Sequence, residues 1–313
     1  SDADVQSWIE RNGYARPVLV RYGEWLGVVP GWTRTEGEVT TGRCIADGQT
    51  TGPVRCGVLQ GNWGYSTVFK QPVSVIIADR LAATGLLMMW VMIVMVPASL
   101  LIGVLSGMRE GSRLDRGLSV FSIASTATPE YVSGVVLIAL LASTTTGLSP
   151  WLSDNGWIDG NTLFMGTATS AMEGITFWNF SLPVMTIALY GIGYIARMTR
   201  ASMTEVMTAQ YIRTARLKGV SFGNVVMKHA LRNALIAPFT VIMLQFPWLL
   251  NGVVIVETLF NYKGFGWTLV QAAGNNDIEL LLACSVVAVF VVLVTQLISD
   301  IGYVFLNPRI RLS

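Results

Sequence analysis

The sequence predicts an all-α polytopic membrane protein, because of its low charge content, its long uncharged windows and the uneven placement of its basic residues. Of the 313 residues, 52% are hydrophobic and 13% are charged. Soluble domains carry about 25% charged residues, so this chain has about half the charge expected of one. Its apolar content excludes a disordered chain, and a net charge of +2 does not indicate nucleic-acid binding.

Five windows of membrane-spanning length carry at most one charged residue each. About 20 apolar residues cross a hydrocarbon core about 30 Å thick, and backbone groups in lipid have to be paired within helices or closed barrels. Barrel strands of about 10 residues alternate in polarity, whereas these windows are longer and do not alternate, so we predict helices. The windows are residues 81–108, 117–149, 174–196, 233–256 and 280–299.

The loops between these windows differ in charge, and the difference predicts the orientation. Residues 197–232 carry seven basic residues against one acid, Glu205, whereas residues 148–178 carry three acids and no base. The C-terminal tail adds Arg309 and Arg311. Because Lys and Arg are enriched on the cytoplasmic side, we predict that residues 197–232 and the C-terminus are cytoplasmic.

Counting back from this loop places residues 1–80 outside. The chain starts at Ser1 and shows no signal-peptide pattern, so we expect a further N-terminal transmembrane helix that is missing from this chain. The predicted organisation is an external segment over 1–74, a transmembrane domain over 75–306 that contains the loop 197–232, and a cytoplasmic tail over 307–313.

Cys44 and Cys56 lie in a glycine- and threonine-rich part of the external segment. In an oxidising compartment we predict a disulfide between them, worth about 3 kcal/mol, the alternative being two free thiols. Cys284 lies in an apolar window and is expected to be a packing residue. We predict no metal site, because a zinc site needs further ligands and His229 is cytoplasmic.

Residues 211–219 predict a short helix on the cytoplasmic face. Four side chains share the spacing of one helix face, and Gly219 suits the left-handed position that ends a helix. Ser221 can cap a second helix that runs through His229. The first helix can seat in a groove of another protein, or it can be a solvated amphipathic loop. The four side chains are Tyr211, Thr214, Ala215 and Lys218.

This stretch resembles the EAA loop of ABC-importer permeases, and specifically the first of the two paired permeases in the dipeptide, oligopeptide and nickel importer family. The resemblance rests on YIRTARLKG over 211–219 and KHALRNA over 228–234. The family usually has Asp where Asn307 stands, and the glutamate that names the loop is absent here. Further similar segments are residues 61–66, 71–73, 196–203, 252–257, 264–266, 300–303 and 307–311.

The resemblance implies a type I ABC importer transmembrane fold, with five helices in this chain, in the bacterial inner membrane. It implies four partners: a second homologous permease, two ATPase subunits and a periplasmic solute-binding protein. The chain has no Gly-x-x-x-x-Gly-Lys-Ser/Thr loop, so we expect no enzyme activity and no cofactor here, with ATP and Mg on the ATPase subunits. Residues expected to serve ATPase coupling are Tyr211, Arg213, Thr214, Ala215, Arg216, Lys218, Gly219 and His229, the last by packing or capping.

Glu130 follows Pro129 about 13 residues, or about 20 Å, into its window. A carboxylate at that depth has to face protein or water, so Glu130 is expected either to line a translocation path or to pair with a neighbouring helix. Three residues spaced on one face of the fourth window are also expected to line the path. They are Gln245, Trp248 and Asn251.

Other polar and small residues of the windows have structural interpretations. Glu257 and Asp300 lie near window ends and are expected to anchor the helix boundaries. Gly103 and Gly107 form a Gly-x-x-x-Gly pattern, which predicts close helix packing.

Two other function classes are weighed against an importer permease. An ion-coupled secondary transporter is the alternative, but it predicts more intramembrane charge and inverted repeats. An intramembrane enzyme needs a nucleophile with a base, or a metal set, and the sequence shows neither. The expected cargo is peptides or similar small solutes, with dipeptide, oligopeptide, nickel complex and sugar left open.

Overall fold

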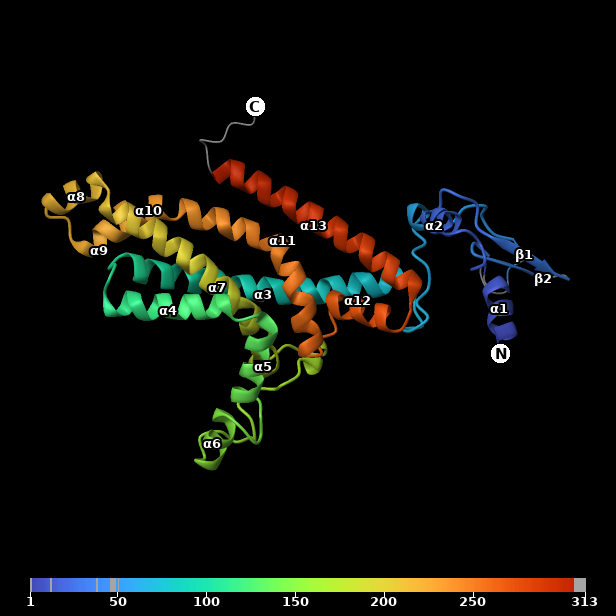
Figure 1. The fold of residues 1–313 in the computed structure, drawn as a ribbon, viewed down its shortest axis with the longest axis horizontal. Helices are drawn as coiled ribbons and strands as arrows, with labels where there is room; N and C mark the ends of the chain where they lie inside the picture. Colours follow the sequence, from blue (N-terminus) through green and yellow to red (C-terminus); the bar gives the residue numbers. More distant parts are fainter. Residues whose placement is uncertain (1, 12, 38, 46–48, 50, 307–313) are drawn as a thin grey trace. The chain divides into compact units, whose positions relative to one another are not determined.

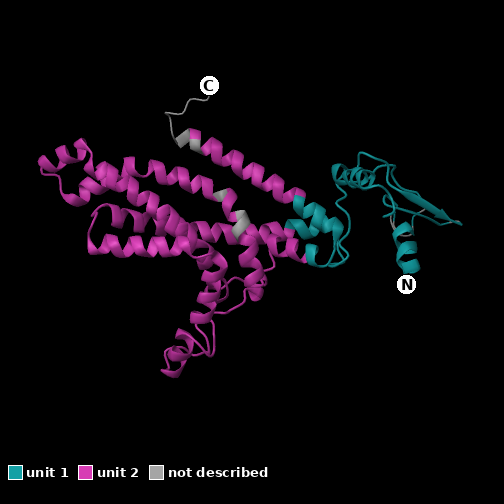
Figure 2. Cartoon of the chain, in the orientation of Figure 1, with its two compact units in different colours: residues 1–78, 272–285 teal, residues 79–271, 286–313 magenta. Residues whose placement is uncertain are grey.

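A computed structural model describes residues 2–11, 13–37, 39–45, 49 and 51–306 (Figure 1). The tail 307–313, with Asn307, Arg309 and Arg311, lies outside the described residues. The chain divides into two compact units (Figure 2). They are residues 1–78 with 272–285, and residues 79–271 with 286–313.

The first unit combines short helices with a β-hairpin. Strands β1 (Thr33–Glu36) and β2 (Val39–Gly42) pair antiparallel, with Thr33 opposite Gly42. Cys44 and Cys56 are joined by a disulfide, with their Cα atoms 5.4 Å apart. The helices are α1 (Asp2–Arg11), α2 (Val18–Leu26) and the 3-10 helix η1 (Val58–Gln60).

Two carboxylates of residues 272–285 hold the N-terminal segment within this unit. Asp277 is 1% exposed and accepts a hydrogen bond from the Ser66 hydroxyl at 2.5 Å. Glu279 accepts one from the backbone N–H of Tyr65 at 2.9 Å and pairs with Arg43 at 2.9 Å. The unit is therefore built from two parts of the chain that lie about 200 residues apart in sequence.

The second unit is built of helices. Helices α3 (Val73–Gly107) and α13 (Ile278–Leu306) contribute residues to both units. The other helices are α4 (Arg113–Ala127), α5 (Glu130–Leu141), α6 (Leu148–Asp154), the 3-10 helix η2 (Thr169–Met172), α7 (Phe177–Thr208), α8 (Gln210–Leu217), α9 (Phe222–Asn224), the π-helix η3 (Val225–Ala230), α10 (Leu231–Ala234), α11 (Ile236–Leu259) and α12 (Phe265–Gly274).

Helices in the described part of the chain match the five predicted windows. Three are long and apolar enough to cross a membrane by themselves, and they lie in α3, α7 and α13. Two helix pairs, each bent at a break, are long and apolar enough only when the members of a pair are taken together: α4 with α5, bent by 111°, and residues 222–234 with 236–249, bent by 50°. The all-α polytopic fold is confirmed, but two predicted windows are broken helices.

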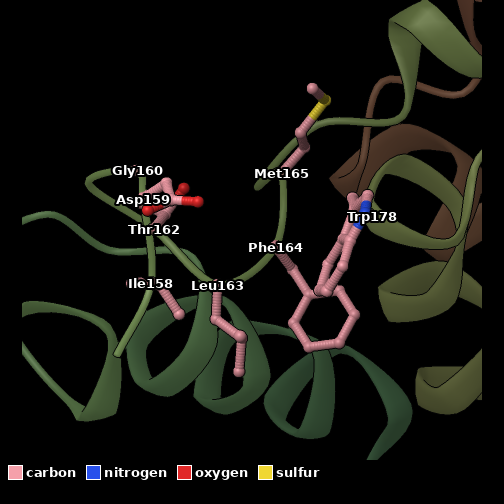
Figure 3. Close-up of a pocket in the computed structure, with 8 residues that line it drawn as sticks. All are labelled: Ile158, Asp159, Gly160, Thr162, Leu163, Phe164, Met165 and Trp178. Carbon is pink, nitrogen blue, oxygen red and sulfur yellow. The ribbon is translucent and has the colours of Figure 1, made fainter. Parts of the chain in front are cut away.

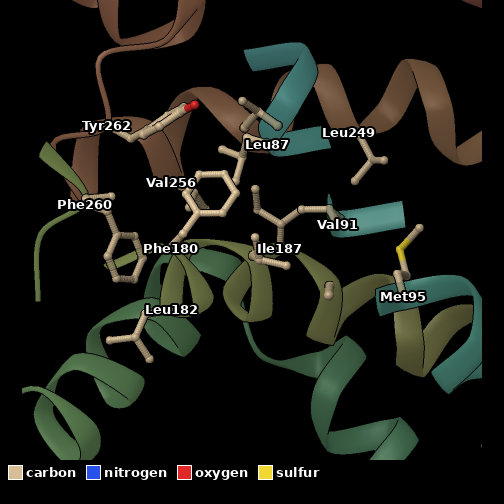
Figure 4. Packing of buried hydrophobic residues seen from close by; sticks show 14 of the residues in the cluster. Leu87, Val91, Met95, Phe180, Leu182, Ile187, Leu249, Val256, Phe260 and Tyr262 are labelled. Atoms are coloured by element: carbon tan, nitrogen blue, oxygen red, sulfur yellow. The ribbon is translucent and has the colours of Figure 1, made fainter. Parts of the chain in front are cut away.

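The core of the second unit lies where α3, α7 and α11 meet (Figure 4). Leu87 and Val91 of α3 are fully buried, as are Ile187 of α7 and Leu249 of α11. Tyr262 closes this core and donates its hydroxyl to the Ala83 carbonyl at 2.9 Å. Burial raises the pKa of Tyr262 to about 12.

Gly103 and Gly107 bring α3 against α7. A Cβ atom at Gly103 would collide with Thr199, and one at Gly107 would collide with Met203. Small residues at such positions let two helix backbones approach closely. The close packing that the Gly-x-x-x-Gly pattern predicts is confirmed.

Candidate coupling segment and translocation path

The segment predicted to couple to an ATPase forms a short helix directly after α7. Helix α7 ends at Thr208, and Ala209 has extended backbone with ψ of 148°, so that α8 begins as a separate helix at Gln210. Gly219 has φ of +78°, which confirms the left-handed turn expected after α8. The turn separates α8 from the next helical segment.

One side of α8 is buried inside the molecule and the other is exposed. Ile212 and Ala215 pack against Met203 and the buried side of η3, including Val226. Ala215 is therefore buried, whereas Tyr211, which is spaced for the same face of the helix, is exposed. The exposed predicted residues are Tyr211, Arg213, Thr214, Arg216, Lys218 and Gly219.

The second predicted helix exists but is irregular. Ser221 is the N-cap residue of α9, but its side chain makes no capping hydrogen bond; its carbonyl accepts the first helical bond, from the Val225 N–H at 2.9 Å. His229 lies in the π-helix η3 and is exposed. Asn233 of α10 donates to the Tyr211 hydroxyl at 2.9 Å, which ties this segment to α8.

Glu130 is placed differently from the expectation of a residue deep within one continuous helix. Pro129 is the N-cap of α5, so Glu130 is the first residue after the break between α4 and α5. Its side chain is partly exposed at this helix N-terminus. A proline both removes a backbone donor and restricts the preceding residue, which explains why the helix ends here.

Of the predicted path residues on α11, Gln245 and Trp248 have described side chains, whereas the side chain of Asn251 lies outside the described set. Gln245 is 5% exposed, and its Nε2 has no hydrogen-bond partner among the described residues. Trp248 stacks on Tyr190 of α7, with ring centroids 4.4 Å apart. Tyr190 is therefore a neighbour of Trp248 that the sequence did not identify.

Glu257 is not the boundary anchor that its position suggested. It has no exposed surface and accepts hydrogen bonds from the Thr84 hydroxyl and from the Trp267 N–H, the latter at 2.9 Å. Asp300, by contrast, is exposed on α13 and accepts from Gln296 at 2.9 Å. Only the folded chain places Thr84, 173 residues away, beside Glu257.

The structure also contains an ion pair that sequence reasoning missed. Arg200 of α7 contacts Asp115 at the start of α4, with Nε 2.6 Å from Oδ1. Both residues lie in basic stretches of the sequence, where a partner 85 residues away gives no local signal. The resemblance over residues 196–203 includes Arg200 but does not identify Asp115.

The acidic segment between α5 and α7 forms a hollow of about 530 Å³ (Figure 3). The rings of Phe164 and Trp178 lie 5.6 Å apart at one end, and Asp159 lies at the other. Of the three acidic residues in this segment, all of them exposed, Asp159 lines the hollow, whereas Asp154 and Glu173 do not. Over the described residues, no group of three or more His, Cys, Asp or Glu side chains could hold a metal ion.

Comparison with known proteins now identifies the family. Residues 99–312 match the family described as "Binding-protein-dependent transport system inner membrane component". The chain belongs to this family. It is therefore an inner-membrane permease subunit of an ABC importer, with the helical transmembrane fold that its hydropathy predicts, and the family is not itself catalytic.

Relatives that match over most of their length agree with this assignment. An oligopeptide transport system permease of Bacillus subtilis is 32% identical, over 99% of this chain and 86% of the relative. A probable peptide ABC transporter permease of Sinorhizobium fredii is 35% identical, over 81% of this chain and 77% of the relative. A dipeptide transport system permease of Haemophilus influenzae is 32% identical, over 81% of this chain and 78% of the relative.

A solved structure shows the same fold. The crystal structure of an amino acid ABC transporter with histidines matches 74% of this chain and 94% of its own, with a TM-score of 0.52 and 14% identity. At this identity the likeness concerns the fold alone.

Proposed function

We propose that this permease moves peptides or similar small solutes, delivered by a periplasmic binding protein, with energy from ATP hydrolysed on two partner ATPase subunits. A second homologous permease completes the pathway. The names of the relatives, which carry oligopeptides, peptides or dipeptides, support the cargo class. ATP and Mg belong to the ATPase subunits.

The observation that carries the coupling proposal is the exposed face of α8. Arg213 and Arg216 of this short helix and Lys218, its C-cap residue, are exposed, whereas Ile212 packs the other side of the helix into an internal core. A basic helix fixed on one side and free on the other can seat in a groove of a partner. Because Lys and Arg are enriched on the cytoplasmic side of membrane proteins, the same basic residues support a cytoplasmic location of α8 and the C-terminus.

The predicted domain boundaries fit this arrangement. Residues 1–74 form the external part, residues 75–306 the transmembrane domain and residues 307–313 a cytoplasmic tail. The disulfide between Cys44 and Cys56 suits an oxidising external compartment. The exposed carboxylates Asp154, Asp159 and Glu173 lie on the same external side, where the binding protein docks.

Within the membrane we assign Glu130, Gln245, Trp248 and Asn251 to the translocation path. The unpartnered Nε2 of Gln245 is a buried donor that a peptide carbonyl can satisfy. Glu130, at a helix break, offers a carboxylate to a substrate amine. The stacked Trp248 and Tyr190 supply an aromatic surface beside them.

The test is uptake by a reconstituted complex. We expect labelled di- or oligopeptide to enter proteoliposomes that hold both permeases and both ATPases, only when ATP is on the ATPase side and binding protein on the other. Collapsing ion gradients with ionophores should leave uptake intact. Uptake that follows an ion gradient without ATP would instead establish a secondary transporter.

A further inference from the structure

Asp115, at the start of α4, is a buried carboxylate on which three helices converge. Its side chain is 3% exposed and accepts from Nε and Nη2 of Arg200 on α7, at 2.6 and 2.9 Å. It also accepts from the Ser106 hydroxyl of α3 at 2.5 Å and the Ser119 hydroxyl at 3.2 Å. The Gly111 N–H, in the turn between α3 and α4, donates at 2.8 Å.

The two bonds from Arg200 fix the register of α4 against α7. A guanidinium that forks onto a carboxylate defines both distance and orientation, which a single hydrogen bond or a lysine does not. Farther along, the two helices meet through uncharged contacts: Gly193 packs against the Ser122 carbonyl, and the Ser125 hydroxyl donates to the Leu189 carbonyl at 2.6 Å. To these contacts the ion pair adds two charge-assisted hydrogen bonds, which hold α4 and α7 together more strongly than neutral ones do.

Arg200 also lies close to α8. It precedes the end of α7 at Thr208 by eight residues, about 12 Å along the helix. Between them, Met203 is fully buried against Ile212 of α8. Val104 of α3 packs on the same cluster. The ends of α3 and α7 and the inner face of α8 therefore form one packed body, to which the ion pair adds α4.

The far end of α4 is the 111° break that precedes Glu130. We propose that the Asp115–Arg200 ion pair is a positioning element for energy coupling: it carries movement of α8 into α4, and through α4 to the break before Glu130. This inference rests on the proposed function, in which α8 receives the ATPase. A bidentate ion pair whose carboxylate is buried suits this role, because the two side chains either move together or separate.

The experiment compares solute transported per ATP hydrolysed in the reconstituted full complex. Variants are Arg200→Gln, Asp115→Asn, Arg200→Lys and the exchange Asp115→Arg with Arg200→Asp. Arg116→Gln is the matched control, because Arg116 is the next residue on α4 and is exposed. A second readout is the thiol-labelling rate of Ala127→Cys, the last residue of α4, with and without ATP.

We expect Arg200→Gln and Asp115→Asn to assemble and hydrolyse ATP while transport per ATP falls by about fivefold or more. The ATP-dependent change in Ala127→Cys labelling should disappear with them, whereas Arg200→Lys and the exchange should restore part of both readouts. An unchanged transport ratio and labelling response would overturn the proposal. The proposal would also be overturned if no variant assembled, Arg200→Lys included, since the ion pair would then only stabilise the fold.

The result for the ion pair can be distinguished from a failure of the proposed function. If the wild-type complex itself takes up no peptide, the proposed function is wrong. The labelling response of Ala127→Cys to ATP still tests the ion pair in that case. Loss of that response in Arg116→Gln as well would show a general effect of charge on α4 and would contradict a specific role for Asp115.

Discussion

The Thr84 hydroxyl donates to Oε1 of Glu257, so a fully buried carboxylate on α11 has its partner on α3. The same Thr84 oxygen accepts from the Phe265 N–H at 2.8 Å. Gly264 and Gly266 leave room for the carboxylate, because a Cβ atom at either would contact it. Glu257 thus organises the loop that leads into α12.

Replacing Glu257 by Ala should therefore destabilise the permease. The change leaves buried donors of Thr84 and Trp267 without an acceptor, at a cost of about 1–3 kcal/mol. The measurement is the thermal unfolding midpoint in detergent, with Asp154→Ala, an exposed carboxylate, as the control. Equal midpoints for the two variants would contradict a structural role of Glu257.

Gly219→Val should uncouple ATP hydrolysis from uptake or weaken ATPase docking. Gly219 has φ of +78°, where a side chain costs about 1–2 kcal/mol, so the turn after α8 should shift. Gly223→Val is the matched control, since Gly223 has open space around its Cα and no positive φ. Transport per ATP and co-purification of the ATPase subunits are measured. Normal uptake by Gly219→Val would refute the coupling assignment of this turn.

The disulfide predicts a defined pattern of thiol alkylation. The chain has three cysteines, and Cys284 is the free one, so the denatured protein should take one label before reduction and three after it. Mass spectrometry counts the labels. Three labels without reductant would show that Cys44 and Cys56 are free thiols. Joint replacement of both by Ser should lower stability by about 3 kcal/mol.

Glu130→Gln should weaken transport of peptides with a free N-terminus. Loss of a charge-assisted hydrogen bond is worth about 1.5–3 kcal/mol, which corresponds to about tenfold or more in apparent affinity. Uptake kinetics are compared for a free and an N-acetylated peptide, and only the former should respond. Glu173→Gln, an exposed external carboxylate, controls for loss of charge. An equal response of both peptides would favour a purely structural Glu130.

Local patterns in the sequence were sufficient to predict the features that depend on neighbouring residues alone. Spans follow from runs of apolar residues that have to meet lipid, and the end of α8 follows from a glycine that tolerates positive φ. The close packing of Gly103 and Gly107 against α7 follows from the absence of a side chain at both positions. The exposed basic face of α8 follows from charge, although the burial of Ala215 shows that spacing alone does not choose which side faces inward.

Tertiary packing decided the rest, because the deciding contacts join residues far apart in the chain. A proline inside a window is a local signal, but Pro97, Pro183 and Pro247 lie within continuous helices, so only the structure shows that the break falls at Pro129. A charged residue near the end of a window can lie among lipid headgroups or be buried in the protein. Only the folded structure, in which the Thr84 hydroxyl donates to Glu257, shows that Glu257 is buried. Likewise, the sequence shows Asp115 between Arg113 and Arg116, and only the packing of α7 against α4 shows that its ion-pair partner is Arg200.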